Sequence, residues 1–138
     1  MDRDDAIVIL KSRPVSSFEA AQRAAAKLIS LDALIAGDAG NERLYGEICR
    51  IIADVYMHGS NRETVIDGEV TTYGYVQEIF CLLEAENVVA VVQALERYPR
   101  EIRYKKAFVR TALYNTIFEL EAGAENEYAQ DHPNFYGV

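Results

Sequence analysis

Apolar residues recur at helical spacing over most of this chain, and this periodicity restricts its fold more than any other feature. The segment NERLYGEICRIIADVYMHG, residues 41–59, predicts a helix with one apolar face. That face carries Leu44, Ile48, Ile51, Ile52 and Val55. Further helices are predicted near residues 17–29, 30–37, 72–83, 86–97 and 104–121. The sequence therefore predicts a mainly α fold, a compact bundle of five or six helices.

The chain divides into a short N-terminal arm, residues 1–15, and a single helical domain, residues 16–138. In the arm, the apolar run AIVIL fits either a short strand or an apolar helical turn, and Pro14 ends both. The domain begins with SSFE, in which Ser16 and Glu19 have the spacing of a capping box at a helix start. No later stretch has the length of a linker, so we expect one compact domain.

The helical pattern is interrupted by RETVIDGEVTT, residues 62–72, which has the composition of a β-hairpin. Asp67 and Gly68 stand between two short runs of β-branched residues. A two-residue hairpin turn needs positive φ at both central positions, and Asp-Gly is a favoured pair there. Because an isolated hairpin is marginal in water, we expect this one, near residues 63–71, to rest on the neighbouring helices.

Composition favours a cytoplasmic protein without a membrane span. Apolar runs such as NVVAVVQAL, residues 87–95, are much shorter than the about 18 residues that cross a bilayer. The acidic start MDRDD does not resemble a cationic secretory leader. Cys49 and Cys81 each lie within an apolar helical pattern, which predicts two buried thiols in a reducing compartment.

No motif in the sequence indicates a catalytic, metal or cofactor site. The chain lacks G-x-S-x-G, a glycine-rich phosphate loop and H-E-x-x-H. Its two histidines, His58 and His132, have no second ligand at a spacing that suits a metal. Acid pairs such as Glu84 and Glu86 are typical of solvated helix ends. We therefore expect a protein that is not an enzyme and uses neither cofactor nor metal.

Positive charge is concentrated around one aromatic helix of an otherwise acidic chain. The net charge is −8, yet residues 97–110 contain six basic residues and one acid, Glu101. On a helix that begins near residue 104, Arg103, Arg110 and Tyr114 fall on one side, away from the apolar stripe. The candidate residues for binding a partner protein or nucleic acid are Arg97, Arg100, Arg103, Lys105, Lys106, Arg110 and Tyr114.

Two interpretations of this basic segment stay open. In the first, it faces outward and binds a phosphate backbone or an acidic partner, and Lys105 and Lys106 in the first helical turn help to hold an anion. In the second, its charges pair with carboxylates of the same chain, for example those of the helix at 78–96 or of the acidic tail. Only a few phosphates would be neutralised in the first case, so any binding to single-stranded DNA is expected to be weak and salt-dependent.

Four motifs follow one another along the chain. They are ISLDALI at 29–35, the hairpin from Arg62 to Glu69, AFVRTALYN at 107–115, and a terminal Tyr136-Gly137. This order resembles the C-terminal domain of unknown function of replication initiator proteins from plasmids and mobile elements of Gram-positive bacteria, over about residues 29–137. The 107–115 segment is also distantly similar to the DnaD-type domains of primosome proteins, although Thr116 stands where that family has Trp.

The resemblance implies a non-enzymatic accessory domain of plasmid or mobile-element replication initiation. Such a domain would contact a replication or other host protein, for example a primosome protein such as primase or a helicase loader, or bind single-stranded DNA weakly. The acidic remainder of the chain supports an alternative, a mobile-element-encoded inhibitor that binds a host nucleic-acid-processing or defence protein. A structural dimerisation module is the third interpretation.

Overall fold

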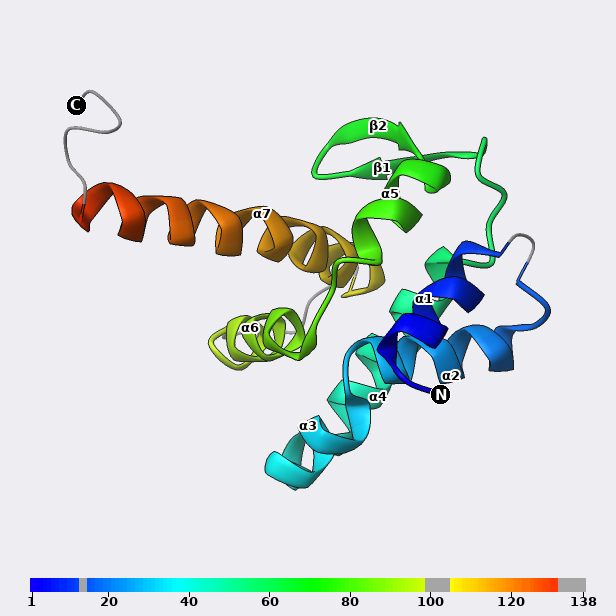
Figure 1. Ribbon diagram of the computed structural model, residues 1–138, viewed down its shortest axis with the longest axis horizontal. Coiled ribbons are helices and arrows are strands. Elements are labelled where there is room, and N and C mark those ends of the chain that lie inside the picture. Colours follow the sequence, from blue (N-terminus) through cyan, green and yellow to red (C-terminus); the bar gives the residue numbers. More distant parts are fainter. Residues whose placement is uncertain (13–14, 99–104, 132–138) are drawn as a thin grey trace.

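A computed structural model describes residues 1–12, 15–98 and 105–131 (Figure 1). Within these ranges it contains seven α-helices, one 3-10 helix and a two-stranded antiparallel hairpin, which confirms the mainly α fold class. The helices outnumber the predicted five or six because the N-terminal arm is itself helical. In these ranges, no helix combines the length and apolar character needed to cross a membrane. The elements are α1 Arg3–Lys11, α2 Phe18–Leu28, α3 Leu31–Gly37, η1 Ala39–Asn41, α4 Glu42–Val55, β1 Glu63–Ile66, β2 Glu69–Thr72, α5 Tyr73–Phe80, α6 Ala85–Glu96 and α7 Lys105–Asp131.

Helix α4 is the centre of the fold. It contacts α2, α3, α5, α6 and α7, and Figure 1 shows α1, α2 and α3 grouped with α4 at one end of the molecule. The apolar face predicted for this segment is its core face, since Ile48, Ile52 and Val55 are fully buried. The helix ends at Val55, before the Gly59 at which the sequence pattern ended it.

The N-terminal arm forms helix α1, so the helical form is the correct one of the two that the sequence allowed. Its start is a capping box in which the Asp2 carboxylate accepts from the Asp5 amide and the Asp5 carboxylate accepts from the Asp2 amide. Ala6 and Leu10, one turn apart, are fully buried. The arm is therefore packed into the core, chiefly against α2.

Helix α2 begins at a different serine from the one predicted. Ser17 is the N-cap residue, and its hydroxyl accepts from the Ala20 amide at 3.0 Å. The predicted capping box between Ser16 and Glu19 is wrong, because with Ser17 as the cap the third helical residue is Ala20, which has no side-chain acceptor. Ser30 does precede α3, but with φ 56° and without a side-chain capping bond.

The predicted hairpin is confirmed, including its turn. Asp67 and Gly68 have φ values of 53° and 78°, as a two-residue turn of this kind requires. The strands pair so that Ile66 lies opposite Glu69 and Val65 opposite Val70. Ile66 is buried, and the Asp67 amide donates to the Thr111 hydroxyl of α7 at 3.3 Å. The hairpin thus rests on α7, as its marginal intrinsic stability led us to expect.

Helix α7 continues well past Glu121, where the sequence pattern ended it. The added residues are rich in Glu and Ala, which are strong helix formers, and Gly123 does not interrupt the helix. Val109 and Leu113 are fully buried, as the predicted stripe requires. Other residues that the predictions used, namely Pro14, Pro99, Ile102, Tyr104, Tyr136 and Gly137, lie outside the described residues.

Both cysteines are free and buried, which confirms the prediction of two buried thiols. Burial raises the pKa of the Cys49 thiol to about 11, against a smaller lowering effect of Arg50. The sulfur of Cys81 lies 3.3 Å from the hydroxyl oxygen of Tyr56. Each thiol is therefore part of the core between helices.

Candidate partner-binding surface

The predicted site residues are divided among different neighbours. Arg100 and Arg103 lie outside the described residues, and Arg97 is exposed directly after the end of α6. The other four lie on α7, where two of them face α4 and two face α5. These four are Lys105, Lys106, Arg110 and Tyr114.

Lys105 and Lys106 pair with carboxylates of α4. Lys105 Nζ lies 3.0 Å from Glu47 Oε2, and Lys106 Nζ lies 2.7 Å from Asp54 Oδ2. The interpretation of internal pairing therefore holds for these two lysines, although the acids come from α4 and not from the helix at 78–96. The cause is tertiary, because the start of α7 packs beside α4. Both lysines remain about half exposed, so these pairs orient α7 more than they stabilise it.

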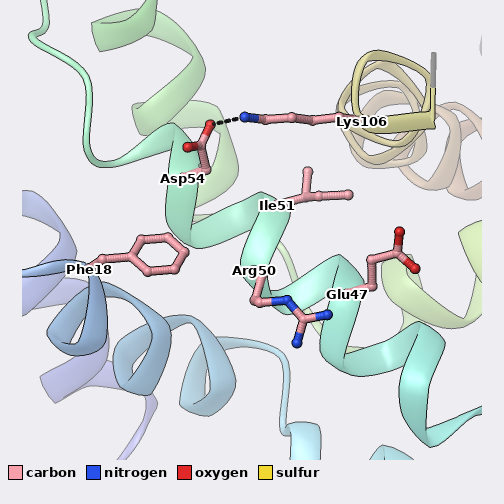
Figure 2. A pocket seen from close by; sticks show the side chains of 6 residues that line it. All are labelled: Phe18, Glu47, Arg50, Ile51, Asp54 and Lys106. Atoms are coloured by element: carbon pink, nitrogen blue, oxygen red, sulfur yellow. Dashed lines mark ion pairs between the residues drawn. The ribbon is translucent and has the colours of Figure 1, made fainter.

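An open hollow of about 330 Å³ lies between α2, α4 and the first turn of α7. Figure 2 shows Lys106 reaching across to Asp54 of α4. Phe18 comes from α2, and Arg50 comes from the same helix as Asp54. Within the described chain, the Arg50 guanidinium forms no ion pair. The hollow is lined by Phe18, Glu47, Arg50, Ile51, Asp54 and Lys106. Its walls are thus of mixed charge, and in the described ranges no three side chains of His, Cys, Asp or Glu gather to hold a metal ion.

The Asp54 pair gives a pH-dependent prediction. Burial alone would raise the Asp54 pKa, but Lys106 and His58 outweigh burial and lower the pKa from 3.8. Because the folded-state pKa lies below the unfolded value, the stabilising effect is complete above about pH 4 and is lost as the pH falls through the lowered pKa. We expect Asp54→Asn to reduce the free energy of unfolding by about 0.5–1 kcal/mol at pH 7.

Urea unfolding of both proteins between pH 7 and pH 2 measures this effect. The difference between the native chain and Asp54→Asn should shrink to zero at the acidic end. Asp32→Asn, which removes an exposed carboxylate that forms no ion pair in the described ranges, is the matched control. A difference that stays constant over the whole range would contradict the role assigned to the Lys106 pair.

Arg110 faces α5 and is only partly exposed. Its Nη1 donates to the Tyr73 hydroxyl at 3.2 Å, and its buried Nε has no hydrogen-bond partner among the described residues. Tyr73 in turn stacks on the His58 ring, with centroids 4.0 Å apart and planes 15° apart. The sequence placed Arg110 on an exposed side of the helix, but α5 packs against this side. Its guanidinium is therefore held by the Tyr73 hydroxyl of the same chain.

Tyr114 belongs to a row of three rings, which we call the aromatic row: Tyr75, Tyr114 and Phe118. The Tyr114 hydroxyl donates to the Tyr75 hydroxyl at 3.3 Å. The Tyr75 and Tyr114 centroids are 6.3 Å apart, and those of Tyr114 and Phe118 are 5.0 Å apart, with tilted planes in both pairs. Tyr75 is 45% exposed and Phe118 is 40% exposed. The row therefore presents ring surface to solvent across α5 and α7.

Two carboxylates of the hairpin lie near Tyr114 at one edge of the aromatic row. The hydrogen bond to Tyr75 raises the Tyr114 pKa, and burial and the charges of Tyr75, Glu69 and Asp67 add to this, giving a pKa of about 12. Glu69 lies opposite the buried Ile66, so its side chain is on the face of the hairpin that turns toward α7. In the described part of the chain, neither Asp67 nor Glu69 forms an ion pair.

Sequence reasoning missed most of this surface. Tyr75 and Phe118 are not among the candidate residues of the sequence, and Asp67 and Glu69 indicate only a hairpin there. Phe118 follows Tyr114 by four residues, so helical spacing alone placed their rings next to each other. The pairing with Tyr75 had no sequence signal, because it depends on how α5 packs on α7.

No protein-family model, curated protein or solved structure matches the chain. A function must therefore be inferred from the motifs of the sequence and from the geometry of this surface.

Proposed function

We propose that this chain is a non-enzymatic accessory domain of plasmid or mobile-element replication initiation, and that it contacts a protein of the replication machinery. One observation carries the proposal: the two most specific motifs of the resemblance meet at a single surface. Thr111 of the AFVRTALYN helix contacts the hairpin turn, and Arg110 and Tyr114 of the same helix contact the first turn of α5, which directly follows the hairpin. The contacts are Arg110 with Tyr73, Thr111 with Asp67, and Tyr114 with Tyr75.

Packing explains only part of this motif. Val109 and Leu113 are fully buried, so the fold alone accounts for them. Tyr114, by contrast, is only partly buried and lies beside the exposed Tyr75. Partly exposed aromatic residues held in a fixed arrangement are typical of protein interfaces. A protein contact at this surface therefore gives the polar and aromatic half of the motif a role.

The charges of this surface favour a protein over nucleic acid. Lys105 and Lys106 are already paired with Glu47 and Asp54. Nucleic-acid binding needs several free cations for the phosphates, and a net charge of −8 opposes it.

The test is binding of the full chain to purified host primase, replicative helicase and helicase loader, and to single-stranded DNA, at about 50 and about 200 mM salt. We expect one of the replication proteins to bind at both salt concentrations, and single-stranded DNA to bind weakly at the lower one only. Deletion of the gene should also lower the copy number of its element. If no replication protein binds and the copy number stays the same, the proposal is wrong.

Three candidates remain on the basic segment. Arg97 forms no ion pair with α4 within the described chain, and Arg100 and Arg103 lie outside the described residues. The double variant Arg97→Glu/Arg103→Glu separates their role from that of the aromatic row. If this variant loses binding to the replication protein while variants of the aromatic row keep it, the partner contact lies on the basic segment.

A second candidate function is an inhibitor of a host nucleic-acid-processing or defence protein. The observation in its favour is the exposed pair of carboxylates at the hairpin turn, Asp67 and Glu69, which would compete with phosphates for a basic channel. Recovery of a nuclease from host lysate, with DNA displacing the chain, supports this function. Recovery of replication proteins alone contradicts it.

A further inference from the structure

The aromatic row lies on a part of the surface that the rest of the described chain leaves open. Tyr75 and Phe118 are 45% and 40% exposed although each is held against Tyr114. Aromatic rings fixed by neighbours lose little conformational entropy on binding, and they dominate many protein interfaces. The faces of such rings also attract Lys and Arg side chains.

The hairpin adds fixed negative charge at one edge of the row. Its tip is held on α7 by the bond from the Asp67 amide to the Thr111 hydroxyl, which keeps the Asp67 and Glu69 carboxylates near Tyr114. Both carboxylates are exposed and form no ion pair within the described ranges. A cation over the rings would therefore meet two unneutralised carboxylates.

The sequence that follows Phe118 in α7 is also acidic. In Figure 1 the second half of this helix, coloured orange to red, projects past α6 and the hairpin. The sequence of residues 119–131 contains five acidic residues and no basic one.

We propose that the aromatic row, together with Asp67 and Glu69, binds an arginine- or lysine-rich segment of a partner protein. Cationic side chains of the segment stack on the rings and pair with the two carboxylates, while their aliphatic parts cover the exposed ring surface. The partner of the proposed function would thus carry an arginine- or lysine-rich segment. The site itself is argued from the structure, and only the biological role of the complex rests on the proposed function. Phosphate groups would be repelled at the same place.

The full chain is titrated with three labelled probes, and binding is followed by fluorescence anisotropy at low and physiological ionic strength. The probes are a short arginine–leucine peptide, the same peptide with glutamate in place of arginine, and oligothymidylate. We expect the arginine peptide to bind at both ionic strengths, the glutamate peptide not to bind, and oligothymidylate to bind only weakly and only at low ionic strength. Asp67→Asn/Glu69→Gln should weaken this binding about tenfold at low salt and flatten its salt dependence. Asn is suitable at position 67 because it tolerates the positive φ of the turn.

Tyr75→Ala/Phe118→Ala should also weaken binding of the arginine peptide, by about fivefold to tenfold, but should leave its salt dependence intact. Phe18→Ala is the matched control for the rings, because Phe18 is 38% exposed on another face. Glu19→Gln/Glu42→Gln is the matched control for the charges, since both residues are exposed on α2 and α4. Both controls should bind within about twofold of the native chain.

Native affinity of Asp67→Asn/Glu69→Gln for the arginine peptide would overturn the proposal. Tighter binding of oligothymidylate than of the arginine peptide would overturn it as well, and would assign the row to base stacking. Should Tyr75→Ala/Phe118→Ala fail to fold, the charge variant alone decides. A replication protein that binds all these variants equally disproves this site but leaves the proposed function standing. If the arginine peptide binds as expected but no replication protein binds, the proposed function is wrong and this binding site stands.

Discussion

Replacing Gln77 by leucine is expected to lower the free energy of unfolding by about 3 kcal/mol. Gln77 is fully buried, and its Nε2 donates to the backbone carbonyls of Val55 and His58, both at 2.9 Å. These carbonyls lie at and just beyond the C-terminal end of α4, where helix carbonyls lack intrahelical partners. Leucine fills a similar volume but cannot donate, so the buried Val55 carbonyl and the partly buried His58 carbonyl would both lose this hydrogen bond. Part of the loss is offset, because the Gln77 Oε1 atom already lacks a hydrogen-bond partner in the part of the chain that the structure describes.

Urea unfolding measures this loss, and Gln93→Leu is the matched control. Gln93 is exposed on α6, so the same substitution there should change the free energy of unfolding by less than about 0.5 kcal/mol. Gln77→Leu should also disturb the aromatic row, because Gln77 anchors the helix that carries Tyr75. Equal stability of the two variants would show that the amide bonds of Gln77 do not hold α5 to α4.

The features that the sequence predicted correctly are those with local causes. The hairpin turn depends on Asp67 and Gly68 alone, and both have the positive φ values that their residue types favour. The core face of α4 follows from spacing within one segment. The helix boundaries were less predictable. The predicted N-cap of α2 was Ser16, and the structure uses Ser17, the next residue. The tail of α7 contains Gly123, a residue type common at helix ends, yet the helix continues to Asp131 because the surrounding residues favour it.

The candidate surface was less predictable than the fold, because helical spacing gives the direction of a side chain but not its neighbour. Arg110 does point away from the apolar stripe, yet α5 covers that side and Tyr73 accepts from its guanidinium. Lys105 reaches Glu47, which is 58 residues away in the sequence. Only the packing of α7 against α4 and α5 decides which charges are paired. The exposed carboxylates near Tyr114 follow from the same packing.

Replacing Arg3 by alanine is expected to lower the free energy of unfolding by about 3 kcal/mol. The Arg3 guanidinium donates to three backbone carbonyls: Nε to Leu28 at 3.3 Å, and Nη2 to Cys81 and Leu83 at 3.2 and 3.0 Å. Leu28 is the last residue of α2, and Cys81 and Leu83 follow α5. Arg3 therefore caps the C-terminal ends of two helices, where a positive charge is also favourable with the helix dipole.

Two further variants separate the geometry of this contact from its charge. Arg3→Lys keeps the charge but loses the planar group that reaches several carbonyls at once, so we expect about half of the loss, roughly 1.5 kcal/mol. Arg43→Ala removes an exposed arginine of α4 and should change the free energy of unfolding by less than about 0.5 kcal/mol. If Arg3→Ala is no less stable than Arg43→Ala in urea unfolding, the three carbonyl bonds contribute nothing. If the expected order is found, residues 1–12 stabilise the fold through Arg3 as well as through the buried side chains of α1.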